Sequence, residues 1–100
     1  MTTTIEIHPP QRKTDLLSAI GETLRAARKE RGLTLRQVAG SAHVSISYLA
    51  EIERGEKDPS SRVLESIAEG LGIGMGDLLI CIATTLEPAE TPPVASTLAA

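Results

Sequence analysis

The sequence predicts an all-α fold of five helices, and three observations support this prediction. Apolar residues recur at steps of three and four over most of the chain, which is the period of an α-helix. Serine or threonine precedes several of these periodic segments, and glycine follows them, as at helix starts and ends. No segment has a convincing strand pattern. With no Phe, no Trp and one Tyr among 100 residues, the core must consist of Leu, Ile, Val and Ala.

The first two helices are expected over residues 16–31 and 35–41. The apolar face of the first helix is formed by Leu17, Ile20, Leu24 and Ala27. Gly32 follows its last turn, where glycine commonly ends a helix. Thr34 is placed to cap the second helix. The apolar side of that helix is formed by Leu35, Val38 and Ala39.

A tight turn joins the second helix to a third, expected over residues 46–54. His43 is expected to link them in the left-handed conformation, which His tolerates better than β-branched residues do. Ser45 is placed to cap the third helix, and Gly55 to end it. The two helices can share an inner face formed by Val38, Ala39, Val44, Leu49 and Ile52. Such a pair presents the N-terminal end of its second helix outward.

Two further helices follow. Ser60 or Ser61 caps the fourth, whose apolar face is formed by Val63, Leu64, Ile67, Ala68 and Leu71. The fifth, from Met75 to about Ile82, is very apolar. Beyond it the chain is rich in Pro, Thr, Ala and Glu and cannot bury enough surface to offset its ordering entropy. We therefore predict a flexible arm over residues 1–14, a folded domain over 15–85 and a disordered tail over 86–100.

The formal net charge of −3 conceals a polarised distribution. All ten Lys and Arg lie between Arg12 and Arg62, where seven acids accompany them, so this segment has a formal charge of +3. From Val63 onward there are five acids and no bases. Because the local field decides phosphate binding, the basic part is compatible with nucleic acid despite the overall sign.

Several classes of protein are excluded by the sequence. Cys81 is the only cysteine, so no disulfide can form within the chain, which fits a reducing cytoplasm. Neither a signal peptide nor an apolar run of about 18 residues occurs, so we expect a cytoplasmic protein without membrane segments. His8 and His43 do not combine with Cys81 in any metal-site spacing. Glu51 and Glu53 point in different directions on a helix, so no acid/base pair and no enzyme or cofactor is expected.

One segment has a more specific pattern. It consists of Leu24-Arg25 and Arg28, then Gly32-Leu33-Thr34, Val38-Ala39, Val44-Ser45, Ile52-Glu53-Arg54-Gly55, Pro59-Ser60 and Leu71-Gly72. In this order the residues closely resemble the Cro/repressor-type helix-turn-helix family, also called the XRE family, from Ile20 to Ile82. The resemblance implies a compact lambda-repressor-like domain that binds double-stranded DNA and regulates transcription. The alternative is a protein-interaction module of the same fold, such as the antitoxin-like partner of another protein.

The resemblance makes residues 46–54 the recognition helix. According to the resemblance, four side chains of this helix face the DNA bases, namely those of Ile46, Ser47, Ala50 and Glu51. Ile46 and Ala50 can contact a thymine methyl group. Ser47 can donate or accept a hydrogen bond at a base edge, and Glu51 can accept a hydrogen bond from cytosine N4. None is Arg, Asn or Gln, so DNA shape could supply part of the specificity.

Phosphate contacts are expected from Arg36, Gln37, Ser45, Tyr48, Arg54, Lys57, Ser60, Ser61 and Arg62. Packing on the surface of the third helix is the other expectation for Tyr48. The chain departs from the family at Leu35, where a phosphate-binding Gln is common, and at His43, where Gly is common.

The resemblance also implies an ion pair between Arg28 and Glu53. It would tie the first helix to the recognition helix. The other basic residues near the end of the first helix are expected to be solvated and to complement the helix dipole, with a nucleic-acid patch as the alternative; they are Arg25, Lys29 and Arg31.

The fifth helix is apolar over more than one face. A twofold dimer contact is the favoured explanation, formed by Leu78, Leu79, Ile80 and Ile82. Burial of this surface under the N-terminal arm is the alternative. A homodimer would place two recognition helices about 34 Å apart on a palindromic operator.

The segments Thr34-Leu35-Arg36, Tyr48-Leu49, Ile52-Glu53-Arg54-Gly55 and Ser60-Ser61 are similar to the Clp-gene regulator branch of the family. Members of that branch activate protease genes and are themselves degraded. This resemblance implies RNA polymerase and Clp protease as partners. The ending Leu98-Ala99-Ala100 resembles a bacterial degradation tag, with a chance match or an artificial chain end as alternatives.

Overall fold

The computed structural model describes residues 8–86, with side chains from Leu16 onward. Five helices follow one another: α1 (His8–Glu30), α2 (Leu35–Ala42), α3 (Ile46–Glu53), α4 (Ser61–Leu71) and α5 (Met75–Leu86). No strand occurs within residues 8–86. The predicted all-α class is therefore confirmed.

Two helices are longer than predicted. α1 begins at His8 rather than at about Leu16, so it includes residues 8–14, which the sequence assigned to the N-terminal arm. That segment has no apolar periodicity, but proline is tolerated in a first helical turn, where Pro9 and Pro10 stand. α5 continues to Leu86 rather than ending near Ile82. Residues 1–7 of the arm and 87–100 of the tail lie outside the described residues.

The predicted caps set the boundaries of α2, α3 and α4. Thr34, Ser45 and Ser60 are their N-caps, each accepting a hydrogen bond from a backbone N–H in the first turn. His43 ends α2 in the left-handed conformation, with φ 59° and ψ 42°, as predicted. Ser60, rather than Ser61, therefore begins the fourth helix.

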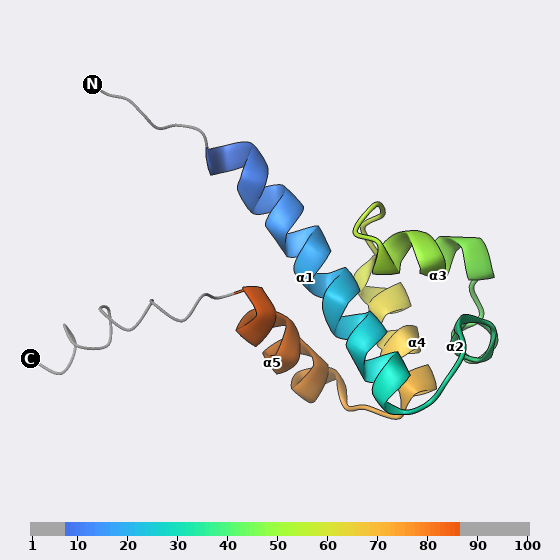
Figure 1. Cartoon of the computed structure of the whole chain (residues 1–100). Helices are drawn as coiled ribbons and strands as arrows, with labels where there is room; N and C mark the ends of the chain where they lie inside the picture. The colour runs from blue at the N-terminus through green and yellow to red at the C-terminus, as the bar shows by residue number, and fades with distance from the viewer. Residues whose placement is uncertain (1–7, 87–100) are drawn as a thin grey trace, which may run out of the picture.

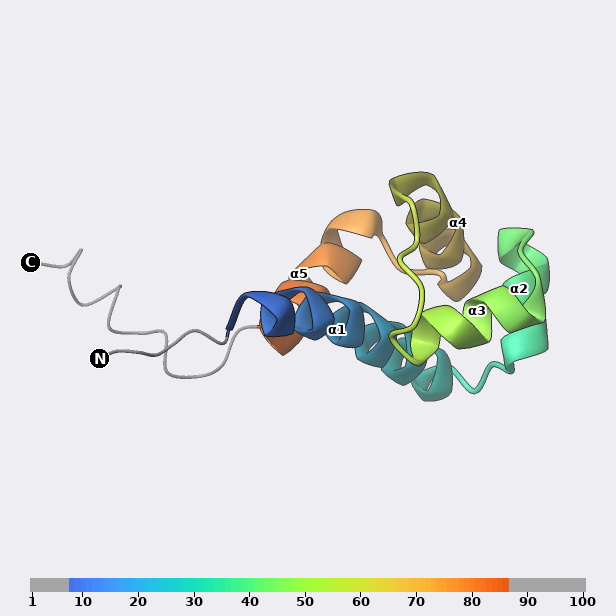
Figure 2. The ribbon, with the colours of Figure 1, turned by 90° about the horizontal axis from the view of Figure 1, so that it is seen from above.

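A single apolar core lies among the five helices. Its fully buried large side chains are Leu24, Val38, Leu49, Ile52, Ile67 and Leu78. The predicted inner face of α2 and α3 is confirmed, since Val38, Ala39, Leu49 and Ile52 are buried and Val44 is partly buried against them. In Figure 1, α5 lies on one side of α1, and α2 and α3 lie on the other. Figure 2 shows α2 and α3 gathered near the C-terminal end of α1.

Gly21 lets α3 approach α1 closely. It is buried in the middle of α1, and a Cβ atom there would lie 2.7 Å from the carbonyl oxygen of Ile52 and would also clash with the backbone of Glu53. The last turn of α3 therefore rests directly on the backbone of α1. This contact fixes the position of the predicted recognition helix relative to the rest of the domain.

Within residues 8–86, no single helix is long and apolar enough to cross a bilayer. α4 and α5 have the length and hydropathy of a span only when they are taken together, with a bend of 104° between them.

Candidate nucleic-acid interface

The predicted recognition helix, α3, has one buried face and one exposed face. Ser45 Oγ accepts a hydrogen bond from Tyr48 N at 3.0 Å, which begins the helix. Leu49 and Ile52 are completely buried and fix its orientation. The first-turn residues Ile46 and Ser47 point outward, and Ile46 has 39% of its surface exposed although it is apolar. A buried pair at positions 49 and 52 thus leaves the leading end of the helix free for a partner.

The remaining predicted base-facing residues are less accessible. Ala50 and Glu51 are partly buried, one turn further along α3. Tyr48 is also partly buried and packs against the core, in agreement with the packing expectation. The exposed end of the helix therefore consists mainly of Ile46 and Ser47.

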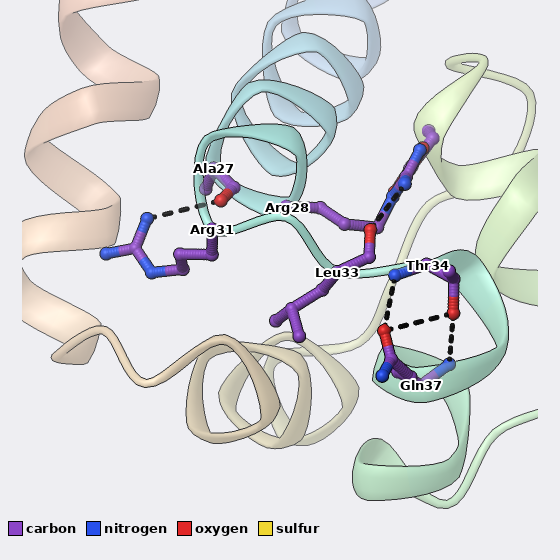
Figure 3. A network of polar contacts seen from close by, with 7 residues as sticks. Ala27, Arg28, Arg31, Leu33, Thr34 and Gln37 are labelled. Atoms are coloured by element: carbon purple, nitrogen blue, oxygen red, sulfur yellow. Dashed lines mark hydrogen bonds and ion pairs between the residues drawn. The ribbon is translucent and has the colours of Figure 1, made fainter.

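The start of α2 is held by a reciprocal capping box. Gln37 N donates to Thr34 Oγ1 at 3.0 Å, and Thr34 N donates to Gln37 Oε1 at 2.8 Å (Figure 3). Because the side-chain oxygen of Gln37 accepts within the box, its NH2 group is the part that can donate to a ligand. Arg36 is exposed in the same turn, whereas Leu35 is partly buried against the core.

Arg28 and Glu53 form the ion pair that the family resemblance implies. Arg28 Nε lies 2.8 Å from Glu53 Oε2, and Arg28 Nη2 lies 3.0 Å from Glu53 Oε1. Arg28 also donates to the backbone oxygen of Leu33 at 2.9 Å, as Figure 3 shows. The two side chains are only 12% and 7% exposed, and the hydrogen bond to Glu53 raises the pKa of Arg28. The pair therefore connects α1, the loop before α2, and α3.

Arg54 forms an ion pair that was not predicted from the sequence. Its Nε and NH2 groups each donate to the carboxylate of Glu56 at 3.0 Å. This hydrogen bonding raises the pKa of Arg54 and lowers that of Glu56. The sequence feature that could have indicated this pair is the acidic residue two positions after the arginine, on the other side of Gly55.

The loop after α3 and the start of α4 present the other predicted phosphate contacts. Lys57, Ser61 and Arg62 are exposed. Ser60 Oγ accepts from Val63 N at 3.2 Å, which leaves its hydroxyl hydrogen free to donate. Pro59 is buried, so the loop is anchored to the domain between Lys57 and Ser60.

A small cavity joins the ends of three helices beside this surface. It has a volume of about 240 Å³ and is lined by Arg25, Arg28, Leu35, Ala50, Glu53 and Arg54. Leu35, the first residue of α2, therefore faces the same cavity as Ala50 and Glu53 of α3. Arg25, expected from the sequence to be only solvated, is exposed and also borders this cavity.

A family model described as a helix-turn-helix domain matches residues 19–79, more than half of the chain. The chain belongs to this helix-turn-helix family. The matched segment includes all of α2, α3 and α4 and parts of α1 and α5. It therefore includes every residue of the predicted DNA-binding surface.

This helix-turn-helix protein is 49% identical over 61 residues to the transcriptional regulator ClgR of Mycobacterium tuberculosis, a match that covers 61% of this chain and 54% of the relative. It is 48% identical over 58 residues to the HTH-type transcriptional regulator DdrOP3 of Deinococcus deserti, covering 58% of this chain and 45% of the relative. The chain spans about half the length of the curated relatives it matches.

Solved structures agree with this placement. The clp gene regulator ClgR from Corynebacterium glutamicum matches with a TM-score of 0.68 at 42% identity, over 72% of this chain and 92% of that chain. The controller protein C.Esp1396I, solved as a tetramer with its natural 35 base-pair operator, matches with a TM-score of 0.67 over 71% of this chain and 93% of that chain. At 24% identity this second likeness shows the fold alone. The resemblance to Cro/repressor-type regulators is confirmed.

The predicted dimer residues of this helix-turn-helix protein do not form one surface. Leu78 is completely buried and Ile82 is 6% exposed, because both point from α5 into the core against α1. Their assignment to a dimer interface is therefore wrong. Leu79 and Ile80 are exposed, at 48% and 64%. Beside Ile80 a groove of about 540 Å³ runs between α1 and α5.

Two further predictions concern other kinds of site. Among the side chains that the structure describes, no three His, Cys, Asp or Glu residues gather where they could hold a metal ion. The degradation-tag residues Leu98, Ala99 and Ala100 lie outside the described residues.

Proposed function

We propose that this helix-turn-helix protein is a sequence-specific DNA-binding regulator of transcription that places the leading end of α3 in the major groove. The observation behind this proposal is the exposure of Ile46 and Ser47 on a helix whose other face is fixed by the buried Leu49 and Ile52. A helix presented in this way can reach base edges with its first turn. The similar curated proteins are transcriptional regulators, which supports the same function.

In this complex, short side chains would read the bases. Ile46 and Ala50 would contact thymine methyl groups, Ser47 would exchange a hydrogen bond with a base edge, and Glu51 would accept from cytosine N4. Because Ala50 and Glu51 are partly buried, most of the direct contact would come from the first turn. Sequence-dependent DNA shape would supply the remaining specificity.

Polar groups around α3 would hold the DNA backbone. Hydroxyl groups of Ser45 and Ser60 and the NH2 group of Gln37 are donors at the starts of α3, α4 and α2, where backbone N–H groups also favour anions. The other proposed phosphate contacts are Arg36, Tyr48, Arg54, Lys57, Ser61 and Arg62. These contacts set the position of the protein and make binding salt-dependent.

We further propose that the protein acts as a homodimer on a palindromic operator. The exposed apolar residues Leu79 and Ile80 lie on α5, which is on the other side of α1 from α3 (Figure 1). A twofold contact there would leave both recognition helices free. The match with regulators named for clp genes makes operators of such genes the first to test, with activation through RNA polymerase as the expected outcome.

Titration of labelled duplexes with the full chain tests the proposal. Affinity for an operator selected from genomic DNA should fall steeply between two salt concentrations, because phosphate binding releases counterions. Ser47→Asp should weaken binding at least tenfold. Arg62→Ala should weaken it and reduce the salt slope by about one, whereas the matched change Lys29→Ala, at an exposed base on α1, should leave it unchanged.

Salt-independent binding, or equal affinities for Ser47→Asp and the wild type, would contradict this function. A tightly co-purifying protein together with no measurable DNA affinity would favour the protein-interaction alternative.

A further inference from the structure

The guanidinium group of Arg54 is occupied by an acid of its own chain. Arg54 is the C-cap of α3, directly after its last residue, and its N–H donates to the carbonyl oxygen of Ala50 at 3.0 Å. Two parallel hydrogen bonds of 3.0 Å join its Nε and Nη2 atoms to Oε2 and Oε1 of Glu56. Both side chains are more than half exposed. The pair therefore lies where a ligand from solution can reach it.

The backbone of the loop places Glu56 beside Arg54. Gly55, between them, has φ 77°, a conformation that suits glycine, and its N–H donates to Ile52 O at 3.0 Å. The N–H of Glu56 donates to Glu51 O at 2.9 Å. These bonds fold the loop back on the end of α3, which places the Glu56 carboxylate within reach of the guanidinium.

Carboxylate and phosphate use the same donors of arginine. Both accept two parallel N–H bonds from one edge of the planar guanidinium, so the Nε–Nη2 edge of Arg54 cannot hold both at once. We propose that Glu56 is an internal competitor that occupies the phosphate-binding fork of Arg54 and thereby limits the affinity of the protein for DNA. This inference rests on the proposed DNA-binding function.

The competition is expected to be weak enough for DNA to win. An exposed ion pair has little net stability in water, so a phosphate can displace the carboxylate. Glu56 is nevertheless charged at neutral pH, as an exposed carboxylate is, and the hydrogen bonds from Arg54 lower its pKa further. A phosphate that binds through the Nε–Nη2 edge must therefore displace Glu56, and the displaced carboxylate remains near the phosphates and repels them. The effect should reduce non-specific and operator binding alike, since both depend on phosphate contacts.

The decisive experiment is a double-mutant cycle on the full chain, with the selected operator duplex and a scrambled duplex as probes. Glu56→Gln keeps the shape of the side chain and removes its charge. It should tighten binding to both duplexes by about two- to fivefold and steepen the salt slope by up to about one. Glu69→Gln removes the same charge at an exposed position of α4 and serves as the matched control, with no change expected beyond twofold.

The second half of the cycle tests whether Glu56 acts through Arg54. In an Arg54→Gln background, Glu56→Gln should give a smaller gain in affinity, because it still removes the repulsion between the carboxylate and the phosphates but releases no guanidinium. An equal gain in both backgrounds, or no gain in either, would overturn the inference. Absence of salt-dependent DNA binding by the wild type would instead overturn the proposed function. Equal melting temperatures of the variants would establish that these differences arise in the folded protein.

Discussion

Arg28 is the single residue with the largest expected effect on stability. Its guanidinium satisfies both the carboxylate of Glu53 and the backbone oxygen of Leu33 in a largely buried position. Arg28→Ala would leave the Glu53 carboxylate, 7% exposed, without its partner, so we expect a loss of about 3 kcal/mol in the free energy of unfolding. Urea denaturation measures it, and Lys29→Ala, exposed in the same turn, should change the value by less than about 0.5 kcal/mol.

The pH dependence of this effect follows from the pKa of Arg28. The hydrogen bond to Glu53 raises that pKa above its ordinary value. The stabilisation from the arginine is therefore fully present below the ordinary value and is lost only as strongly alkaline pH is reached. Arg28→Ala should accordingly cost the same at pH 6 and pH 8. If Arg28→Ala melted at the same temperature as the wild type at either pH, the structural role of the pair would be refuted.

His43 is strained by its backbone conformation. At φ 59° and ψ 42° its Cβ crowds the backbone, whereas glycine adopts this region without that cost. His43→Gly should therefore raise the free energy of unfolding by about 0.5–1 kcal/mol, after the greater chain entropy of glycine is subtracted. His43→Val should lower it, because β-branched residues tolerate this region least. A destabilised glycine variant in thermal denaturation would show that the imidazole makes a compensating contact.

At the scale of elements, the contact between α1 and α3 depends on the absence of a side chain at Gly21. Gly21→Ala would drive a methyl group into the backbone of Ile52 and Glu53, so we expect a loss of about 2 kcal/mol or more. Gly40, in α2, has open space around its Cβ position. Gly40→Ala should therefore stabilise the protein by about 0.5–1 kcal/mol through helix propensity.

Calorimetry of the two glycine variants gives the comparison. Similar melting temperatures for Gly21→Ala and Gly40→Ala would mean that α3 can move away from α1. In that case the DNA affinity of Gly21→Ala should fall even though its stability does not, because the position of α3 would have changed.

The sequence predicted what local chemistry determines. Thr34, Ser45 and Ser60 were identifiable as caps, and apolar spacing identified the inner faces of α2, α3 and α4, because these signals lie within one turn or one helix. The close approach at Gly21 depends on a second helix over 30 residues away and left no such signal. The beginning of α1 was missed because its first turns have no apolar period.

The same difference between local signals and contacts that depend on the folded chain applies to the site. The family resemblance implied that Ile46 and Ser47 face outward from the third helix, and the structure has them exposed. The pairing of Arg54 with Glu56 depends on how the loop folds after Gly55. The burial of Leu78 depends on which side of α5 meets α1, and a helix that is apolar nearly all round does not specify that side.

Over the whole molecule, α1 separates the two surfaces that the proposed function requires. α3 packs on one side of it and α5 on the other (Figure 1). A charge placed on one surface should therefore leave the other intact, which allows DNA binding and dimer formation to be tested independently. Two exposed isoleucines, Ile46 on α3 and Ile80 on α5, provide matched positions for the same substitution.

Ile80→Glu should convert the protein to a monomer while leaving it folded, because 64% of this side chain is already exposed in the single subunit and burial of its charge could occur only in a dimer. Sedimentation measures the change in mass. The variant should bind a half-site duplex as the wild type does, and should lose the additional affinity for the full palindrome. Ile46→Glu should show the reverse, remaining dimeric but losing affinity for both duplexes. A dimeric Ile80→Glu variant would place the twofold contact elsewhere than on α5.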